Sequence, residues 1–167
     1  GLQLPQPNGE WVLPSVKHFV GDRGTTWGSN TGTANPVFNG NNSQSATADW
    51  RIDQGDTRID EETLRTVHLP PDQEAIDPGA LNIMVSVSSW NGLKMHAHEY
   101  LLTEVLKGEM GFRGFLVSDW KGLSHLASEN YDAVVKAINA ALDMIMVPFE
   151  YKAFITDLTK AVENGDV

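Results

Sequence analysis

The stretch Gly114-Phe115-Leu116-Val117-Ser118-Asp119-Trp120 decides the fold class that the sequence predicts. Its apolar part does not alternate with polar residues, as is typical of a parallel strand that is covered on both faces. A carboxylate that directly follows such a strand lies at its carboxyl end, where parallel α/β folds gather their functional groups. The stretch therefore predicts a buried parallel strand, with Asp119 at a candidate site.

Three more runs of the same apolar, β-rich character occur along the chain, at residues 15–20, 82–87 and 143–147. Apolar stripes with helical spacing separate or follow these runs, at residues 101–106, 134–142 and 154–162. Strands that alternate with helices of this length indicate βαβ units. Four such units are half of an eight-stranded (β/α)8 barrel, so the predicted fold class is α/β, with an incomplete TIM-type barrel over residues 1–167.

The first connection differs from the others. Residues 25–56 are rich in Gly, Asn, Ser and Thr, which is typical of a functional loop or an inserted segment. After this loop, Asp60 is expected to cap a helix, with Glu61 and Glu62 in its first turn. Pro70 and Pro71 are expected to break that helix before residues 73–76.

The composition excludes several classes of partner. The chain has 167 residues, of which 41% are hydrophobic and 20% charged, as in ordinary globular domains. A formal charge of −10 argues against nucleic acid and anionic membranes as partners. No apolar stretch approaches the ~20 residues of a membrane span, and there is no cysteine for a disulfide or a thiolate metal site.

The two ends of the chain suggest a piece of something larger. Residues 1–5 carry neither a signal-peptide pattern nor an initiator Met, so we expect a processed or truncated start. A half-barrel would also leave two strand edges unpaired, which soluble proteins avoid. We therefore expect either a fragment or a chain that associates through these edges.

Polar side chains follow each predicted strand. Asp119 could act as a nucleophile, a general base or a metal ligand, or could simply cap the next helix. Lys17 and His18 adjoin at the first strand end, with Asp22 four residues further on. They could hold a ligand where the strand breaks. Alternatively, they could form a surface Lys–Asp pair beside a packed histidine, and the residue pattern alone favours this second interpretation.

His96 and His98 offer a metal-binding alternative together with Glu99 and Asp119. A metal hydrolase of the barrel type would carry its paired histidines at a strand end. These two lie ten residues beyond the expected strand, at the start of a helix. We therefore expect no metal and no cofactor.

Several motifs occur together in a fixed order. They are Lys17-His18-Phe19-Val20-Gly21-Asp22, Asp53-Gln54-Gly55-Asp56, His68-Leu69-Pro70-Pro71, Ser88-Ser89-Trp90-Asn91-Gly92-Leu93-Lys94-Met95-His96, residues 100–108, residues 111–115 and Val117-Ser118-Asp119-Trp120. In this set the chain resembles glycoside hydrolase family 3, in particular its β-glucosidase and exo-β-glucanase branch. The resemblance covers nearly all of the chain apart from residues 29–51.

The resemblance implies a role for each matching residue. Asp119 falls where the family has its catalytic nucleophile, and the four strands would be the last four of the barrel. Lys17 and His18 match the pair that binds glycone hydroxyls in the minus-one subsite. Trp120 matches an aromatic residue that lines the sugar site, and Asp22 is expected to orient Lys17.

The implied activity is hydrolysis of β-glycosidic bonds at the non-reducing end of β-glucosides or β-glucans. In a retaining mechanism two carboxyl groups lie about 5–5.5 Å apart, one attacking the sugar and one acting as acid and base. In the family the acid/base residue comes from a second domain after the barrel, and no glutamate of this chain is a candidate for it. We therefore expect the isolated chain to be inactive, without its first half-barrel and second domain.

Three residues depart from the family pattern. Arg23 replaces a usual Gly, Asp72 replaces a usual aromatic residue, and Val87 stands where many members carry a Tyr or Phe near the nucleophile. Val87, Arg23 and the missing acid/base residue favour an alternative, a sugar-binding or scaffold piece without catalysis. The sequence leaves the cellular location open, although export of polymer-degrading relatives favours an extracytoplasmic one.

Overall fold

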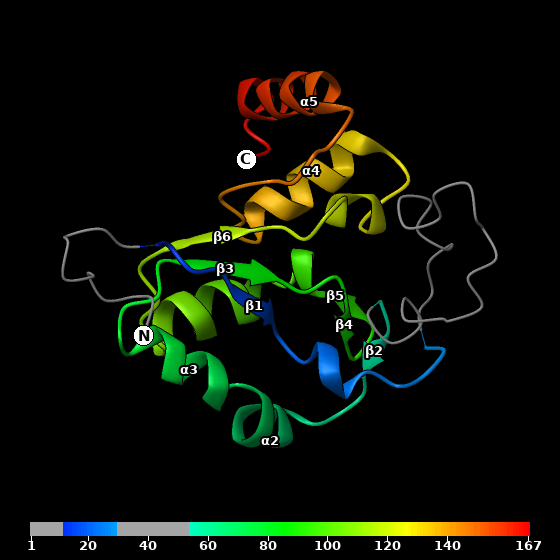
Figure 1. Ribbon diagram of the computed structural model, residues 1–167. Helices are drawn as coiled ribbons and strands as arrows, with labels where there is room; N and C mark the ends of the chain where they lie inside the picture. Colours follow the sequence, from blue (N-terminus) through cyan, green and yellow to red (C-terminus); the bar gives the residue numbers. More distant parts are fainter. Residues whose placement is uncertain (1–11, 30–53) are drawn as a thin grey trace.

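The computed structural model describes residues 12–29 and 54–167 of the chain. Residues 1–11 and most of the predicted 25–56 loop lie outside the described residues. The central sheet has the order β1-β3-β6, with β1 (Val16–Phe19), β3 (Asn82–Val85) and β6 (Phe115–Val117) all parallel. The three strands lie side by side in Figure 1. They confirm three of the four predicted strands.

The fourth predicted strand, at residues 143–147, is reduced to one parallel bridge between Val117 and Met144. The Met144 N–H donates to the Leu116 carbonyl at 2.9 Å, and the Ser118 N–H donates to the Met144 carbonyl at 2.8 Å. The prediction of a full strand was therefore wrong in its length. Within the described residues this segment pairs with β6 alone, through this single bridge.

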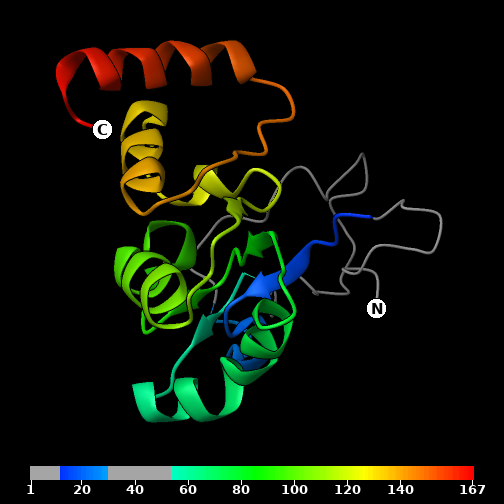
Figure 2. The same cartoon turned by 90° about the vertical axis from the view of Figure 1, so that its left-hand side faces the viewer.

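In Figure 1 helices lie beyond both edges of this sheet, next to β6 and next to β1. The first connection contains α2 (Glu61–Thr63), a π-helical segment η2 (Leu64–His68) and α3 (Pro70–Ile76), and the second contains the π-helix η4 (Tyr100–Glu109). After β6 come α4 (Asn130–Asn139) and α5 (Tyr151–Asn164). Figures 1 and 2 place α4 between the sheet and α5, with α2 and α3 at the opposite end. The predicted alternation of strands and helices is confirmed.

The first helix begins as predicted, because the Asp60 side chain accepts a hydrogen bond from the Thr63 N–H at 2.7 Å. The predicted break is present, between the end of η2 at His68 and the start of α3, and only the start of the second helix was predicted too late. Helix α3 begins at Pro70 itself, where the missing N–H costs no bond because first-turn N–H groups have no partner within the helix.

A second, small sheet was not predicted. It has the order β2-β4-β5, with β2 (Asp56–Thr57) parallel to β4 (Ser89–Trp90), and β4 antiparallel to β5 (Leu93–Lys94). The hairpin between β4 and β5 turns at Asn91 (φ 48°) and Gly92 (φ 88°). Asn-Gly is the preferred pair for a turn with positive φ at both central residues. The Gly92 N–H donates to the Asp56 carboxylate at 2.8 Å, which fastens the hairpin to β2.

The hydrophobic core lies between the central sheet and the helices that flank it. The apolar stripe of η4 is fully buried against it, as its helical spacing predicts. The stripe of α5 is not, because Ile155 and Val162 are 55% and 59% exposed. Among the described elements, α5 packs mainly on α4. None of the described helices combines the length and the apolar character needed to cross a bilayer.

Candidate active site

The site is built at the carboxyl ends of β1 and β6. Asp119 lies two residues beyond the end of β6, His18 belongs to β1, and Asp22 begins the short 3-10 helix η1 (Asp22–Gly24). The His18 Nδ1 atom lies 3.0 Å from an Asp22 oxygen, and its Nε2 atom lies 3.7 Å from the Asp119 Oδ2 atom. The structure therefore brings these three predicted residues together in one row, with the imidazole between two carboxylates.

The backbone of β1 departs from a regular strand where the site begins. The peptide bonds Lys17–His18 and Phe19–Val20 are cis, and the register with β3 shifts between Lys17 and Phe19. The chain then turns at Gly21, whose φ of 85° favours glycine. The buried Thr57 hydroxyl donates to the Gly21 carbonyl at 2.6 Å and holds this turn.

Asp119 does not cap the helix that follows it. Its Oδ1 atom accepts the N–H of the next residue, Trp120, at 2.6 Å, and Oδ2 faces His18. The 3-10 helix η5 (Gly122–His125) is preceded by Lys121 and has no capping bond from that side chain. With 19% of its side chain exposed, Asp119 remains partly accessible.

The charges around His18 favour its protonated form. The hydrogen bond between the ring and the Asp22 carboxylate raises the pKa of His18, and the negative charges of Asp119 and Asp22 act in the same direction. Partial burial and the positive charge of Lys17 oppose this rise without cancelling it. The ring therefore carries positive charge up to a higher pH than an ordinary histidine and attracts both carboxylates.

Lys17 and Trp120 lie at the edges of this row. Lys17 is exposed and lines a pocket of about 290 Å³ with His18 and Asp22. Asp22 was predicted to orient Lys17. Among the described residues its hydrogen bond is instead with His18. The Trp120 side chain is 39% exposed beside the nucleophile candidate.

The same pocket contains two of the residues that depart from the family pattern, Arg23 and Asp72. Asp72 lies in the first turn of α3 and is only 8% exposed. Burial raises the pKa of Asp72 to about 7, and the nearby charge of Asp22 adds to the rise. Val87, the third departure, is buried after β3.

The two histidines of the metal-binding alternative have different partners. His96 accepts the Asp119 N–H at its Nε2 atom, at 2.9 Å. His98 stacks on Trp90 with ring centroids 5.4 Å apart, and its Nδ1 atom accepts the Leu101 N–H at 3.4 Å. In residues 12–29 and 54–167, no group of three His, Asp or Glu side chains is arranged to hold a metal ion.

Sequence reasoning missed two residues that contact Asp119. One is His96, which the sequence suggests only as a metal ligand. The other is Ser118, whose hydroxyl donates to the Asp119 carbonyl at 2.9 Å and accepts the Met146 N–H at 2.8 Å. Position next to Asp119 was a usable signal for Ser118, whereas the His96 contact spans 23 residues of sequence and only the folded chain reveals it.

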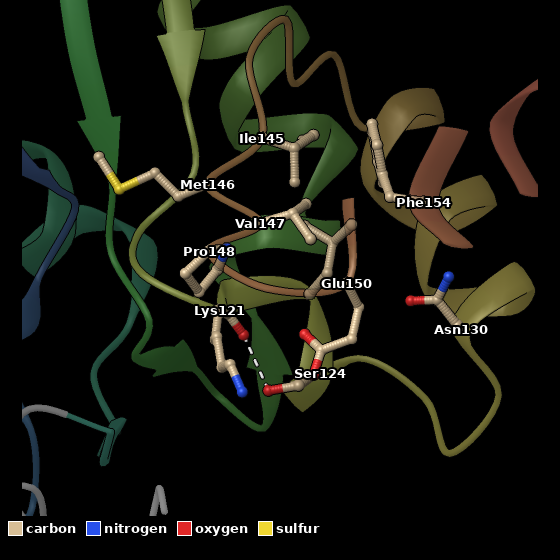
Figure 3. Close-up of a pocket in the computed structure, with 10 residues that line it drawn as sticks. Lys121, Ser124, Asn130, Ile145, Met146, Val147, Pro148, Glu150 and Phe154 are labelled. Atoms are coloured by element: carbon tan, nitrogen blue, oxygen red, sulfur yellow. Dashed lines mark hydrogen bonds between the residues drawn. The ribbon is translucent and has the colours of Figure 1, made fainter. Parts of the chain in front are cut away.

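A separate hollow of about 240 Å³ lies between η5, the segment after Met144 and α5. Figure 3 shows apolar side chains such as Ile145, Val147 and Phe154 around it, with Lys121 and Glu150 near its rim. None of the predicted site residues lines it. The charged row at the strand ends is therefore distinct from this apolar hollow.

Comparison with known proteins shows the family of the chain. The model of the family described as "Glycosyl hydrolase family 3 N terminal domain" matches residues 38–167. The chain belongs to glycosyl hydrolase family 3. A β-glucosidase of Wickerhamomyces anomalus is 33% identical over 98% of this chain, and a lysosomal β-glucosidase of Dictyostelium discoideum is 38% identical over 65% of it.

Solved structures with a similar fold cover most of this chain. An exo-1,3/1,4-β-glucanase from a Pseudoalteromonas species is 35% identical over 93% of this chain, with a TM-score of 0.73. A β-glucosidase from Listeria innocua in complex with glucose has a TM-score of 0.72 at 23% identity, which shows a shared fold. The chain spans only 14% and 18% of the two curated relatives and 16% of the solved glucanase.

Proposed function

We propose that this chain carries the nucleophile of a retaining β-glycosidase and forms the last four βα units of its (β/α)8 barrel. The observation that carries the proposal is the approach of His18 to Asp119 at the carboxyl ends of the strands. Strand β3 separates their strands, which in a flat sheet would lie about 9.6 Å apart. The two side chains meet at 3.7 Å, as expected where the carboxyl ends of parallel strands line one site.

In the proposed reaction the Asp119 carboxylate attacks the anomeric carbon of the terminal sugar. The bond from that carbon to the leaving oxygen breaks, and a second carboxyl group donates its proton to that oxygen. The resulting ester between Asp119 and the sugar is then hydrolysed. The second carboxylate removes a proton from water, the water oxygen bonds to the anomeric carbon, and Asp119 leaves as a carboxylate. We propose that this second group lies outside residues 1–167.

The neighbours of Asp119 suit its role in this reaction. The Trp120 N–H donates to the Asp119 Oδ1 atom, and the His18 ring faces Oδ2, so both hold the carboxylate in place. Lys17 and His18 are proposed to bind glycone hydroxyls, while Asp22 holds the His18 ring through Nδ1. Trp120 is proposed to provide an apolar face for the sugar ring. Such positioning lowers the barrier by holding the anomeric carbon in line with the carboxylate.

The proposed substrates are β-glucosides or β-glucans, cleaved from the non-reducing end. The relatives are β-glucosidases and an exo-β-glucanase by name, which supports this choice of substrate. An extracytoplasmic location is proposed as well, since one relative is a periplasmic β-glucosidase of Salmonella typhimurium, 33% identical over 56% of this chain.

Covalent trapping tests the proposal. The full-length protein is incubated with a 2-fluoro-β-glucoside that carries a good leaving group, and peptic peptides are then analysed by mass spectrometry. We expect the fluoroglucosyl group on Asp119, and none on an Asp119→Asn variant. If the wild type turns over aryl β-glucosides but carries the label on a different carboxylate, Asp119 is not the nucleophile. A protein that neither turns over nor is labelled, yet binds glucose, would support the sugar-binding alternative instead.

A further inference from the structure

The backbone of Asp119 is held by a side chain from a distant part of the chain. His96 lies in the 3-10 helix η3 (Met95–Ala97), and its side chain is completely buried. Its Nε2 atom accepts the Asp119 N–H at 2.9 Å. The imidazole therefore satisfies a part-buried backbone donor that lies just beyond the end of β6.

The turn after Asp119 is shaped around the same ring. A Cβ atom at Gly122 would lie 2.4 Å from His96 Nε2 and 2.7 Å from Cε1, closer than side chains tolerate. The Gly122 N–H donates to the Asp119 carbonyl at 3.0 Å, which closes the turn. Glycine at this position therefore lets the turn approach the imidazole without displacing it.

The ring is in the form that can accept this bond. Because Nε2 accepts, the neutral imidazole carries its proton on Nδ1, an atom that is buried and has no hydrogen-bond partner in the described part of the chain. Burial lowers the pKa of His96 to about 3, and the positive charges of His125, Lys94 and His18 act in the same direction. The ring therefore stays in the neutral form that accepts this bond at neutral pH.

We propose that His96 is a positioning residue for the nucleophile, and that its Nε2 atom, together with the Gly122 turn, fixes where the Asp119 carboxylate points. The inference rests on the proposed function of Asp119. His96 does not reach the sugar in this proposal and acts only through the peptide N–H of Asp119.

Three variants of the full-length protein separate this role from a general contribution to folding. His96→Leu removes the acceptor, whereas His96→Gln places an amide oxygen near the position of Nε2. Gly122→Ala leaves the imidazole intact but forces it away from Asp119. His98→Leu is the matched control, since His98 is a buried histidine of the same turn whose partners are Trp90 and Leu101.

The measurement is the rate constant for labelling by the 2-fluoro-β-glucoside, with the dissociation constant for glucose determined in parallel. We expect His96→Leu and Gly122→Ala to slow labelling by about 100-fold, the effect of a small misplacement of a reacting group. Glucose affinity should stay unchanged, His96→Gln should recover most of the rate, and His98→Leu should label as the wild type does. Gly122→Ala retains His96 and decides the question if the leucine variant does not fold.

Three results would overturn the inference. If the wild type labels at Asp119 and both His96→Leu and Gly122→Ala label at the wild-type rate, His96 does not position the nucleophile. The same conclusion follows if His98→Leu slows labelling as much as His96→Leu does. If the wild type turns over substrate without a label on Asp119, the proposed function itself fails, and the two failures are thus distinguishable.

Discussion

Asp72 should make the stability of this domain depend on pH in an unusual direction. Its carboxyl is 8% exposed, and its pKa rises from 3.8 to about 7 on folding, chiefly through burial. Between these two values the folded chain holds a proton that the unfolded chain has released. Stability therefore falls as the pH rises through this window, and is lowest above pH 7.

The size of the effect follows from the same two values. At about 1.4 kcal/mol for each pKa unit, the ionised Asp72 costs about 4 kcal/mol of folding free energy above pH 7. Asp72→Asn removes the charge but leaves a buried amide, whose missing hydrogen bonds cost about 1–3 kcal/mol. We therefore expect the variant to be more stable than the wild type by about 1–3 kcal/mol at pH 8. Near pH 4 it should be equal to the wild type or less stable.

Urea unfolding of the full-length protein, followed by tryptophan fluorescence at several pH values between 4 and 8, measures this difference. Asp77→Asn is the matched control, because Asp77 is a carboxylate at the end of the same helix that is less buried than Asp72. Parallel stability profiles for wild type and Asp72→Asn would show that Asp72 ionises normally, and would refute the reasoning from burial.

Two further perturbations test other parts of the structure. His18→Asn should cost on the order of 1 kcal/mol at about pH 6 and less at about pH 9, because a raised histidine pKa gives stability that is complete below pH 6.5 and is lost as the pH rises through the folded value. A pH-independent loss would contradict the charged state of His18. Gly114→Ala places a Cβ 2.2 Å from the Leu81 carbonyl oxygen and should cost about 1–3 kcal/mol in urea unfolding. Gly108→Ala, with only a 3.4 Å contact, should be tolerated, and equal losses for both would rule out the clash as the cause.

The sequence predicted the parts of the fold that depend on local pattern. Continuous apolar runs located β1, β3 and β6, and a capping residue located the start of α2. The hairpin of β4 and β5 was also within reach, since Asn91-Gly92 is a recognised turn signal. Its strands are two residues each, too short for a periodicity argument to detect.

Other features depend on partners that a local pattern does not specify. The apolar stripe of α5 has the expected spacing, but spacing does not say what covers Ile155 and Val162. The segment at residues 143–147 has strand composition, yet only Met144 forms a bridge.

Within the candidate site, the residues at the strand ends were predictable because parallel strands bring their carboxyl ends together. Asp119, His18 and Asp22 lie in one row as that rule requires. The hydrogen-bond partner of Asp22 was not predictable from the sequence. Its 3.0 Å hydrogen bond is with His18 and not with Lys17. The contact of His96 with Asp119 depends on tertiary proximity alone.

Both polar groups of the Asp119 backbone are held by side chains, the N–H by His96 and the carbonyl by Ser118. The orientation of the Asp119 carboxylate thus depends on these two side chains and can change without a change of fold. Descendants of this domain could exchange either side chain, keep the same strands and helices, and lose their chemistry. Active and inactive members of such a lineage would share one fold. The residues at the positions of His96 and Ser118 would distinguish them.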